Sequence, residues 1–121
     1  MTKIHNSKLY DLEDRTFRFA KDTTLFVKQL PKNISNLEYG RQVVDASGSV
    51  GANYIEANES LSKKDFIMRI KICRKEAKES AYWLRLIVET NNEECEEEGK
   101  KLLDEAIELK KIFSSILAKS E

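Results

Sequence analysis

The sequence predicts an all-α protein, an up-down-up-down antiparallel four-helix bundle. Its 121 residues suffice for one hydrophobic core, so we expect a single domain over residues 1–121. Four glycines and one proline stand against 35% charged residues, a composition typical of helices with solvated faces. Apolar residues recur every three or four positions in four stretches, as on one face of a helix. We expect helices at about 10–30, 36–60, 63–90 and 93–119.

The first helix is predicted from an apolar row that stops before Pro31, where a helix cannot continue. Phe17 points away from this row because each residue turns a helix by about 100°. We therefore expect Phe17 to make a contact outside the core. The row consists of Leu12, Thr16, Phe19, Thr23, Phe26, Val27 and Leu30.

The second helix is predicted to start with a capping box formed by Ser35 and Glu38, preceded by Ile34. Glycine inside a helix costs up to about 1 kcal/mol relative to alanine, so we expect close helix packing at Ser47, Gly48 and Gly51. The helix carries two apolar rows, and one buried face does not account for both. The main row is Leu37, Gly40, Val44, Ser47, Gly51, Tyr54, Ile55 and Asn58, and the second is Val43, Ala46, Val50, Ala57 and Leu61.

The third helix has three faces. Ser62 and Asp65 repeat the start signal directly after the second helix, and a short link of this kind joins antiparallel neighbours. The predicted core face holds Phe66, Ile70, Cys73, Ala77, Ser80, Ala81, Leu84, Ile87 and Val88. Opposite it lies a basic row of Lys71, Arg74, Lys75, Lys78, Tyr82 and Arg85. Between them lies a mixed row of Arg69, Ile72, Glu76 and Trp83.

The fourth helix opens after Asn92, a suitable N-cap, with a run of glutamates that complements the positive end of the helix dipole. Its inward residues are predicted to be Cys95, Gly99, Leu102, Ala106, Leu109, Phe113, Ile116 and Leu117.

Charge is balanced overall but segregated along the chain. The 21 basic residues equal the 21 acidic ones, so no global field attracts nucleic acid. Residues 61–90 nevertheless hold eight basic and four acidic side chains, against five and nine in residues 91–121. A basic helix row can follow phosphates while Tyr82 stacks on a base. The alternative is a solvated face neutralised by the glutamates of the fourth helix or by another subunit.

No catalytic, cofactor or metal constellation is found. Glu76 and Glu79 suggest half of a di-iron site, but the single histidine, His5, stands in the N-terminal tail. The segment SGSVGAN lacks the spacing of a phosphate loop. Cys73 and Cys95 are expected to be thiols buried in the bundle. Without a signal peptide or a membrane span, we expect a cytoplasmic protein.

Apolar residues exceed what one core face explains, which predicts self-association. The alternative is a widened core covered by the tail and loops. The candidate oligomer interface comprises Phe17, Val43, Val50, Arg69, Ile72, Glu76 and Trp83.

Five segments together resemble a known family, the small four-helix bundle proteins encoded in intervening sequences of bacterial 23S ribosomal RNA genes. The segments are LEDRTFRFAKD (12–22), FVKQLPK (26–32), SGSVGANYIEANES (47–60), SKKDFIMRIKICRKEAKESAYWLRLI (62–87) and the ELKKIFSSILAK ending. The resemblance implies a cyclic homo-oligomer, a homopentamer of bundles, without established activity.

A related branch of this family, the accessory variability proteins of diversity-generating retroelements, implies nucleic-acid binding by a basic pentamer. Carried over, it makes Lys71, Arg74, Lys75, Lys78 and Arg85 candidate RNA contacts. We therefore expect a non-enzymatic homo-oligomer, of unestablished molecular role, that binds RNA through the third helix. The alternative is a protein-binding scaffold that uses Ile72 and Trp83.

Overall fold

The computed structural model describes residues 7–120, and side chains from residue 12 onward. This part of the chain forms four helices and no strand, which confirms the all-α class. The N-terminal tail with His5 lies outside the described residues. The helices are α1 (Ser7–Lys28), α2 (Ile34–Asn58), α3 (Lys63–Thr90) and α4 (Glu93–Ser120).

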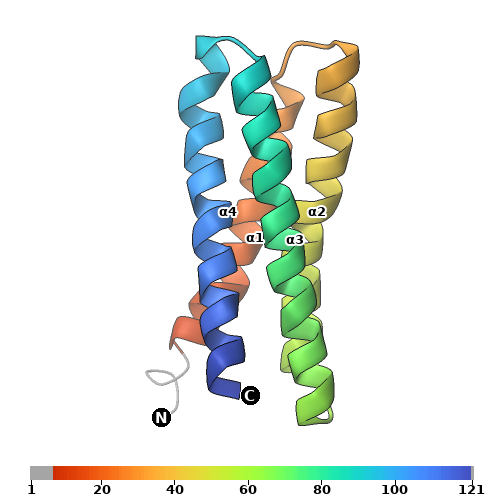
Figure 1. Ribbon diagram of the computed structural model, residues 1–121, viewed down its shortest axis with the longest axis vertical. Helices are drawn as coiled ribbons and strands as arrows, with labels where there is room; N and C mark the ends of the chain where they lie inside the picture. The colour runs from red at the N-terminus through yellow and green to blue at the C-terminus, as the bar shows by residue number, and fades with distance from the viewer. Residues whose placement is uncertain (1–6, 121) are drawn as a thin grey trace.

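The four helices lie side by side along the long axis, and successive helices are linked at alternating ends (Figure 1). Helix α3 packs against α2 and α4 along most of its length. Helix α1 packs against α2 and more sparsely against α4, while α1 and α3 face each other only diagonally. No helix in the described chain is both long and apolar enough to cross a bilayer.

The predicted core rows of α1, α3 and α4 turn inward. Phe19 and Phe113, from α1 and α4, are almost completely buried. Tyr54 of α2 packs against Phe113 with ring centroids 5.9 Å apart, and burial raises the pKa of Tyr54. Cys73 is fully buried as expected. Within the predicted rows, five residues are only partly buried: Val27, Phe66, Ala81, Cys95 and Ile116.

Helix α2 corrects the sequence prediction, because the second row faces the core. Val43 and Val50 are 0% exposed in the single chain, so placing them at an interface with another copy is wrong. Leu37 and Ile55 of the expected main row are 63% and 52% exposed. The cause is the rotation of α2: its main row meets α1 through Gly40 and Gly51 and also buries Ser47 and Tyr54. Leu37, Val44 and Ile55 of that row fall beyond the contact, and Leu61 of the second row is fully exposed.

The helix starts partly differ from the prediction. Helix α2 is capped by Asn33, not Ser35: Asn33 has extended backbone dihedrals (φ −146°, ψ 172°), and its Oδ1 accepts from the Asn36 N–H at 2.9 Å. Ser35 Oγ donates to the same oxygen at 3.1 Å. The cap of α3 is confirmed, since Ser62 Oγ accepts from the Asp65 N–H at 3.1 Å.

The glycines divide into two kinds. A Cβ at Gly51 would lie 3.1 Å from Thr16 Oγ1, and Ser47 is fully buried, so close packing there is confirmed. A Cβ at Gly48 would meet nothing within 4 Å, so that prediction is wrong within this chain. The tightest positions are Gly40 and Gly99, where a Cβ would lie 2.7 Å and 2.6 Å from a valine methyl group.

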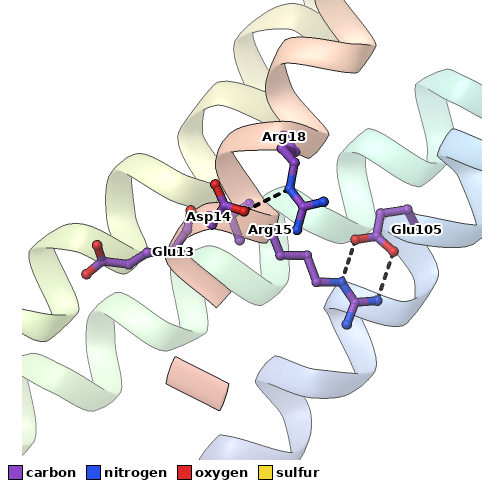
Figure 2. A network of polar contacts seen from close by, with 6 residues as sticks. Glu13, Asp14, Arg15, Arg18 and Glu105 are labelled. Atoms are coloured by element: carbon purple, nitrogen blue, oxygen red, sulfur yellow. Dashed lines mark hydrogen bonds and ion pairs between the residues drawn. The ribbon is translucent and has the colours of Figure 1, made fainter. Parts of the chain in front are cut away.

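Among the polar contacts between helices, two join residues that are more than fifty positions apart in the sequence. Arg15 of α1 donates from Nε and Nη2 to both carboxylate oxygens of Glu105 in α4, at 2.6 and 2.8 Å (Figure 2). At one end of the bundle, the side-chain amides of Asn36 and Asn91 exchange hydrogen bonds of 2.8 and 2.9 Å. These contacts fix α1 against α4 and the start of α2 against the end of α3.

Candidate nucleic-acid interface

The basic row lies on the outer surface of α3, as its helical rotation requires. Lys75, Lys78 and Arg85 are exposed, and Tyr82 is 59% exposed. Tyr82 follows Lys78 by four residues and Lys75 by seven, so the three side chains share one face. Arg74, by contrast, is only partly exposed.

The cations of this row differ in their ionic partners. Arg85 Nε contacts Glu89 Oε2 at 3.0 Å, and both side chains are well exposed. Lys75 and Lys78 form no ion pair within 4.0 Å with any side chain that the structure describes. Exposed ion pairs contribute little stability, so a phosphate can compete for Arg85 and bind the two lysines directly.

A groove of about 520 Å³ follows the junction of α2 with α3 beside the basic row. Trp83 is partly buried there, with its ring centroid 6.0 Å from Tyr39 and 5.1 Å from Tyr82. The Tyr82–Trp83 pair meets edge to face, at an interplanar angle of 76°. We call this the α2–α3 groove. Its lining residues are Gln42, Lys75, Lys78, Glu79, Tyr82 and Trp83.

The mixed row of α3 lies along the same junction and is half covered by α2. Arg69 Nη1 donates to Asn53 Oδ1 at 3.0 Å, and Ile72 is partly buried. Burial, and secondarily the neighbouring Glu79, raise the pKa of Glu76. Much of this row is therefore used inside the chain. Self-association through Arg69, Ile72, Glu76 and Trp83 stays a prediction.

A second surface lies over α1 and α2 and is apolar. Leu37, Val44 and Ile55 share the outer face of α2 and are 63%, 37% and 52% exposed. Phe17, at 65% exposure, lies one turn after Glu13, whose carboxylate accepts a hydrogen bond from Asn58 Nδ2 of α2 at 2.8 Å. Phe17 therefore lies beside this face, outside the core as predicted. We call these four side chains the α1–α2 apolar surface. Leu37 and Val44 also border a depression of about 780 Å³.

Cys73 is buried and poorly suited to nucleophilic chemistry. Cys73 Sγ lies 3.4 Å from the Val50 carbonyl oxygen, and burial raises the pKa of this thiol to about 12. A thiol with such a pKa is protonated and a poor nucleophile at neutral pH. Cys95 is a second free thiol, partly buried. In residues for which side chains are described, no three His, Cys, Asp or Glu side chains are grouped to hold a metal ion.

The sequence did not predict three residues of the groove region. Tyr39 and Gln42 of α2 were not identified at all, and Glu79 was not identified as a lining residue. Tyr39 and Gln42 are three positions apart and therefore neighbours on one helix face. That spacing was a usable signal. Their position opposite Trp83, however, depends on the register between two helices, which periodicity does not report.

Comparison with known proteins supports one assignment. The family described as 23S rRNA-intervening sequence protein matches residues 10–115. A crystal structure of a protein of unknown function, from the S23 ribosomal protein family of Bacteroides thetaiotaomicron VPI-5482, is similar with a TM-score of 0.71 and 28% identity, over 87% of this chain and 96% of that chain. None of the curated proteins compared with the chain matches it. Because the family match spans most of the sequence and confirms the resemblance, this chain belongs to the 23S rRNA-intervening sequence protein family.

Proposed function

We propose that this chain is a non-enzymatic RNA-binding protein that works as a cyclic homo-oligomer, a pentamer, of up-down-up-down antiparallel bundles. The observation that supports this proposal is the outer face of α3, where Lys75 and Lys78 lie exposed beside Tyr82. Among the described side chains, no carboxylate oxygen lies within 4.0 Å of either ammonium group. Lysines spaced along a helix neutralise successive phosphates, and counterion release then supplies the affinity.

Balanced net charge limits this binding to one surface. The chain carries zero formal charge, so an isolated subunit has little long-range attraction for RNA. A ring of identical subunits repeats the α3 face several times around one axis. Linked weak sites bind with a combined affinity above that of any one site. The oligomer is therefore part of the binding function and not only of stability.

The α1–α2 apolar surface supports the oligomer. Phe17, Leu37, Val44 and Ile55 leave four large apolar side chains in water on the α1–α2 side of the bundle, where a second copy could cover them. Covering these side chains with a second copy leaves the basic row of α3 and the α2–α3 groove open. We therefore assign the subunit contact to α1 and α2, with Phe17 retained from the sequence prediction.

The RNA proposal is tested with a fluorescently labelled RNA hairpin titrated at roughly 50 to 200 mM salt. We expect log Kd to rise linearly with log salt concentration. Lys75→Glu with Lys78→Glu should weaken binding at least tenfold at low salt and lower the salt slope by roughly 1 per lost phosphate contact. Lys21→Glu with Lys28→Glu, at two exposed positions of α1, changes the net charge by the same amount and is the matched control. Absence of binding by the wild-type protein at low salt would contradict the proposal.

The second candidate is a protein-binding scaffold. It is favoured by the line of rings Tyr39, Trp83 and Tyr82, since aromatic residues are enriched in protein interfaces. A scaffold would retain a protein partner in a pull-down when Lys75 and Lys78 are reversed, and lose it with Trp83→Ala while the oligomer stays intact. RNA binding, in contrast, would be lost when Lys75 and Lys78 are reversed.

A further inference from the structure

We propose that the α2–α3 groove holds one unpaired nucleotide, with its base on the Tyr82–Trp83 pair and its phosphate on Lys75 and Lys78. The protein would then select looped or single-stranded RNA over duplex RNA. This inference rests on the proposed RNA binding and specifies the class of RNA. It depends on three properties of the groove: its size, its aromatic pair and the separation of its charges.

The size of the groove suits a nucleotide. Its volume of about 520 Å³ lies within the roughly 300–1,000 Å³ typical of small-molecule sites. Helix α3 forms one wall, and α2 contributes Gln42 to the other. A duplex cannot enter such a groove, because its bases are stacked on both faces and its backbone is stiff. An unpaired base, in contrast, can turn out of the strand at small energetic cost.

The aromatic pair supplies the contact that a base requires. Tyr82 is exposed on one side, while its ring packs edge to face against Trp83 at 5.1 Å. The Trp83 ring also packs against Tyr39 of α2, with ring centroids 6.0 Å apart. The pair is thus fixed before the ligand arrives, so little conformational entropy is lost on binding. Base stacking on such rings tolerates any base, because every base has a π-face.

The charges around the groove are arranged for a nucleotide and not for a purely apolar ligand. Lys78 and Lys75 precede Tyr82 by four and seven residues, so a phosphate on these lysines lies within one nucleotide of a base on the ring. Glu79 also lines the groove and precedes Trp83 by four residues. Because Glu79 also follows Lys75 by four residues, it offsets part of the lysine charge as well as repelling phosphate from Trp83. Gln42 and Glu79 remain as polar groups for the edge of the base.

The test uses Trp83, the only tryptophan of the chain, as an internal reporter. The probes are oligouridylate and oligoadenylate of about 12 nucleotides, and a duplex RNA of matched length and strand charge. We expect the unpaired strands to quench Trp83 fluorescence and to bind at least tenfold more tightly than the duplex. The duplex should leave Trp83 fluorescence unchanged.

Variants at Tyr82 separate stacking from charge. Tyr82→Ala should weaken binding of the unpaired strands roughly tenfold and leave duplex binding unaltered, whereas Tyr82→Phe should bind like the wild type. Glu79→Gln should strengthen binding of every probe. Because Tyr82 is exposed, neither variant at this position threatens the core.

Each outcome decides between the two proposals. Equal affinity for strand and duplex, with no loss in Tyr82→Ala but a clear loss in Lys75→Glu with Lys78→Glu, would overturn the nucleotide site and keep RNA binding. Absence of binding to all three probes at low salt would overturn both.

Discussion

Single glycines report how tightly the helices approach. Gly99 lies between two helices, since a Cβ there would meet Val88 Cγ2 at 2.6 Å and Phe26 Cζ at 3.1 Å. Valine is stiff about its only side-chain torsion and cannot easily withdraw. Gly48 has free space instead. Gly99 is therefore required for steric reasons, whereas Gly48 contributes only the cost of glycine to helix formation.

Substitution at these glycines should have opposite effects on the free energy of unfolding. Gly99→Ala is expected to lower it by about 1–3 kcal/mol, because overpacking outweighs the gain in helix propensity. Gly48→Ala should raise it by up to about 1 kcal/mol. Urea unfolding followed by circular dichroism measures both changes. A stabilised Gly99→Ala variant would show that α4 is not held this close to α1 and α3.

Glu76 gives the fold a pH dependence. Its pKa is raised in the folded state, mainly by burial and also by Glu79, so folding favours the protonated carboxyl group. The contribution of Glu76 to the free energy of unfolding is fully present below its pKa in the unfolded chain, about 4.3. It is lost as the pH rises through the higher pKa of Glu76 in the folded state. At neutral pH the charged Glu76 therefore lowers stability.

Glu76→Gln should consequently stabilise the protein at pH 7, by about 0.5 kcal/mol or less because the side chain is partly solvated. The gain should vanish near pH 4. Thermal unfolding of both proteins across this range measures the effect. Glu56→Gln, at an exposed position of α2, serves as the control. An equal gain for both variants at pH 7 would argue against a special environment at Glu76.

At the scale of helices, the paired amides of Asn36 and Asn91 join the α1–α2 link to the α3–α4 link. Asn36 is 4% exposed; its Nδ2 group also donates to the Pro31 carbonyl at 2.9 Å, and that of Asn91 to the Ile87 carbonyl at 2.8 Å. Buried amides left without partners cost about 1–3 kcal/mol. This end of the bundle is thus fixed by polar contacts and not by apolar packing alone.

Removing one amide should be nearly as harmful as removing both. Asn91→Ala is expected to lower the free energy of unfolding by about 1–3 kcal/mol, since it leaves Asn36 Oδ1 without its donor. A double-mutant cycle with Asn36→Ala should give a coupling energy of at least about 0.5 kcal/mol. Purely additive losses would mean that the two links are energetically independent.

The sequence predicted the positions of the four helices well, but it identified the core-facing side correctly only in α1, α3 and α4. In α1, α3 and α4 a single row contains most large apolar residues, so periodicity alone identified the core. In α2 both rows contain valines and small residues, and periodicity could not decide between Val43 and Val44. The deciding factor is tertiary: glycines bring α1 against one flank of α2, and α3 covers the other.

The candidate site was also predictable only in part, because periodicity describes one helix and not the packing between two helices. Rotation about the axis of α3 correctly placed Lys75, Lys78 and Tyr82 on the outer surface. The α2–α3 groove was not predictable, because it needs Gln42 at the height of Trp83 and therefore the register of two helices. The Ser35 capping box failed locally: Asn33 presents an acceptor to the same helix start and adopts the extended backbone of a cap.

At the scale of the whole molecule, the proposed self-association depends on apolar surface that one chain leaves uncovered. Val43 and Val50 do not belong to that surface, since the core encloses them. Phe17, Leu37, Val44 and Ile55 do, and they lie away from the basic row of α3. Identical copies joined through α1 and α2 would present several α3 faces together.

The most direct test is the molar mass in solution, measured by light scattering after gel filtration at micromolar concentration. We expect a mass several times that of the 14.0 kDa chain, with a pentamer as the specific expectation. Leu37→Ser combined with Ile55→Ser should reduce the mass and keep the helical circular dichroism spectrum, because both side chains lie outside the core. A wild-type mass of 14.0 kDa would contradict the account.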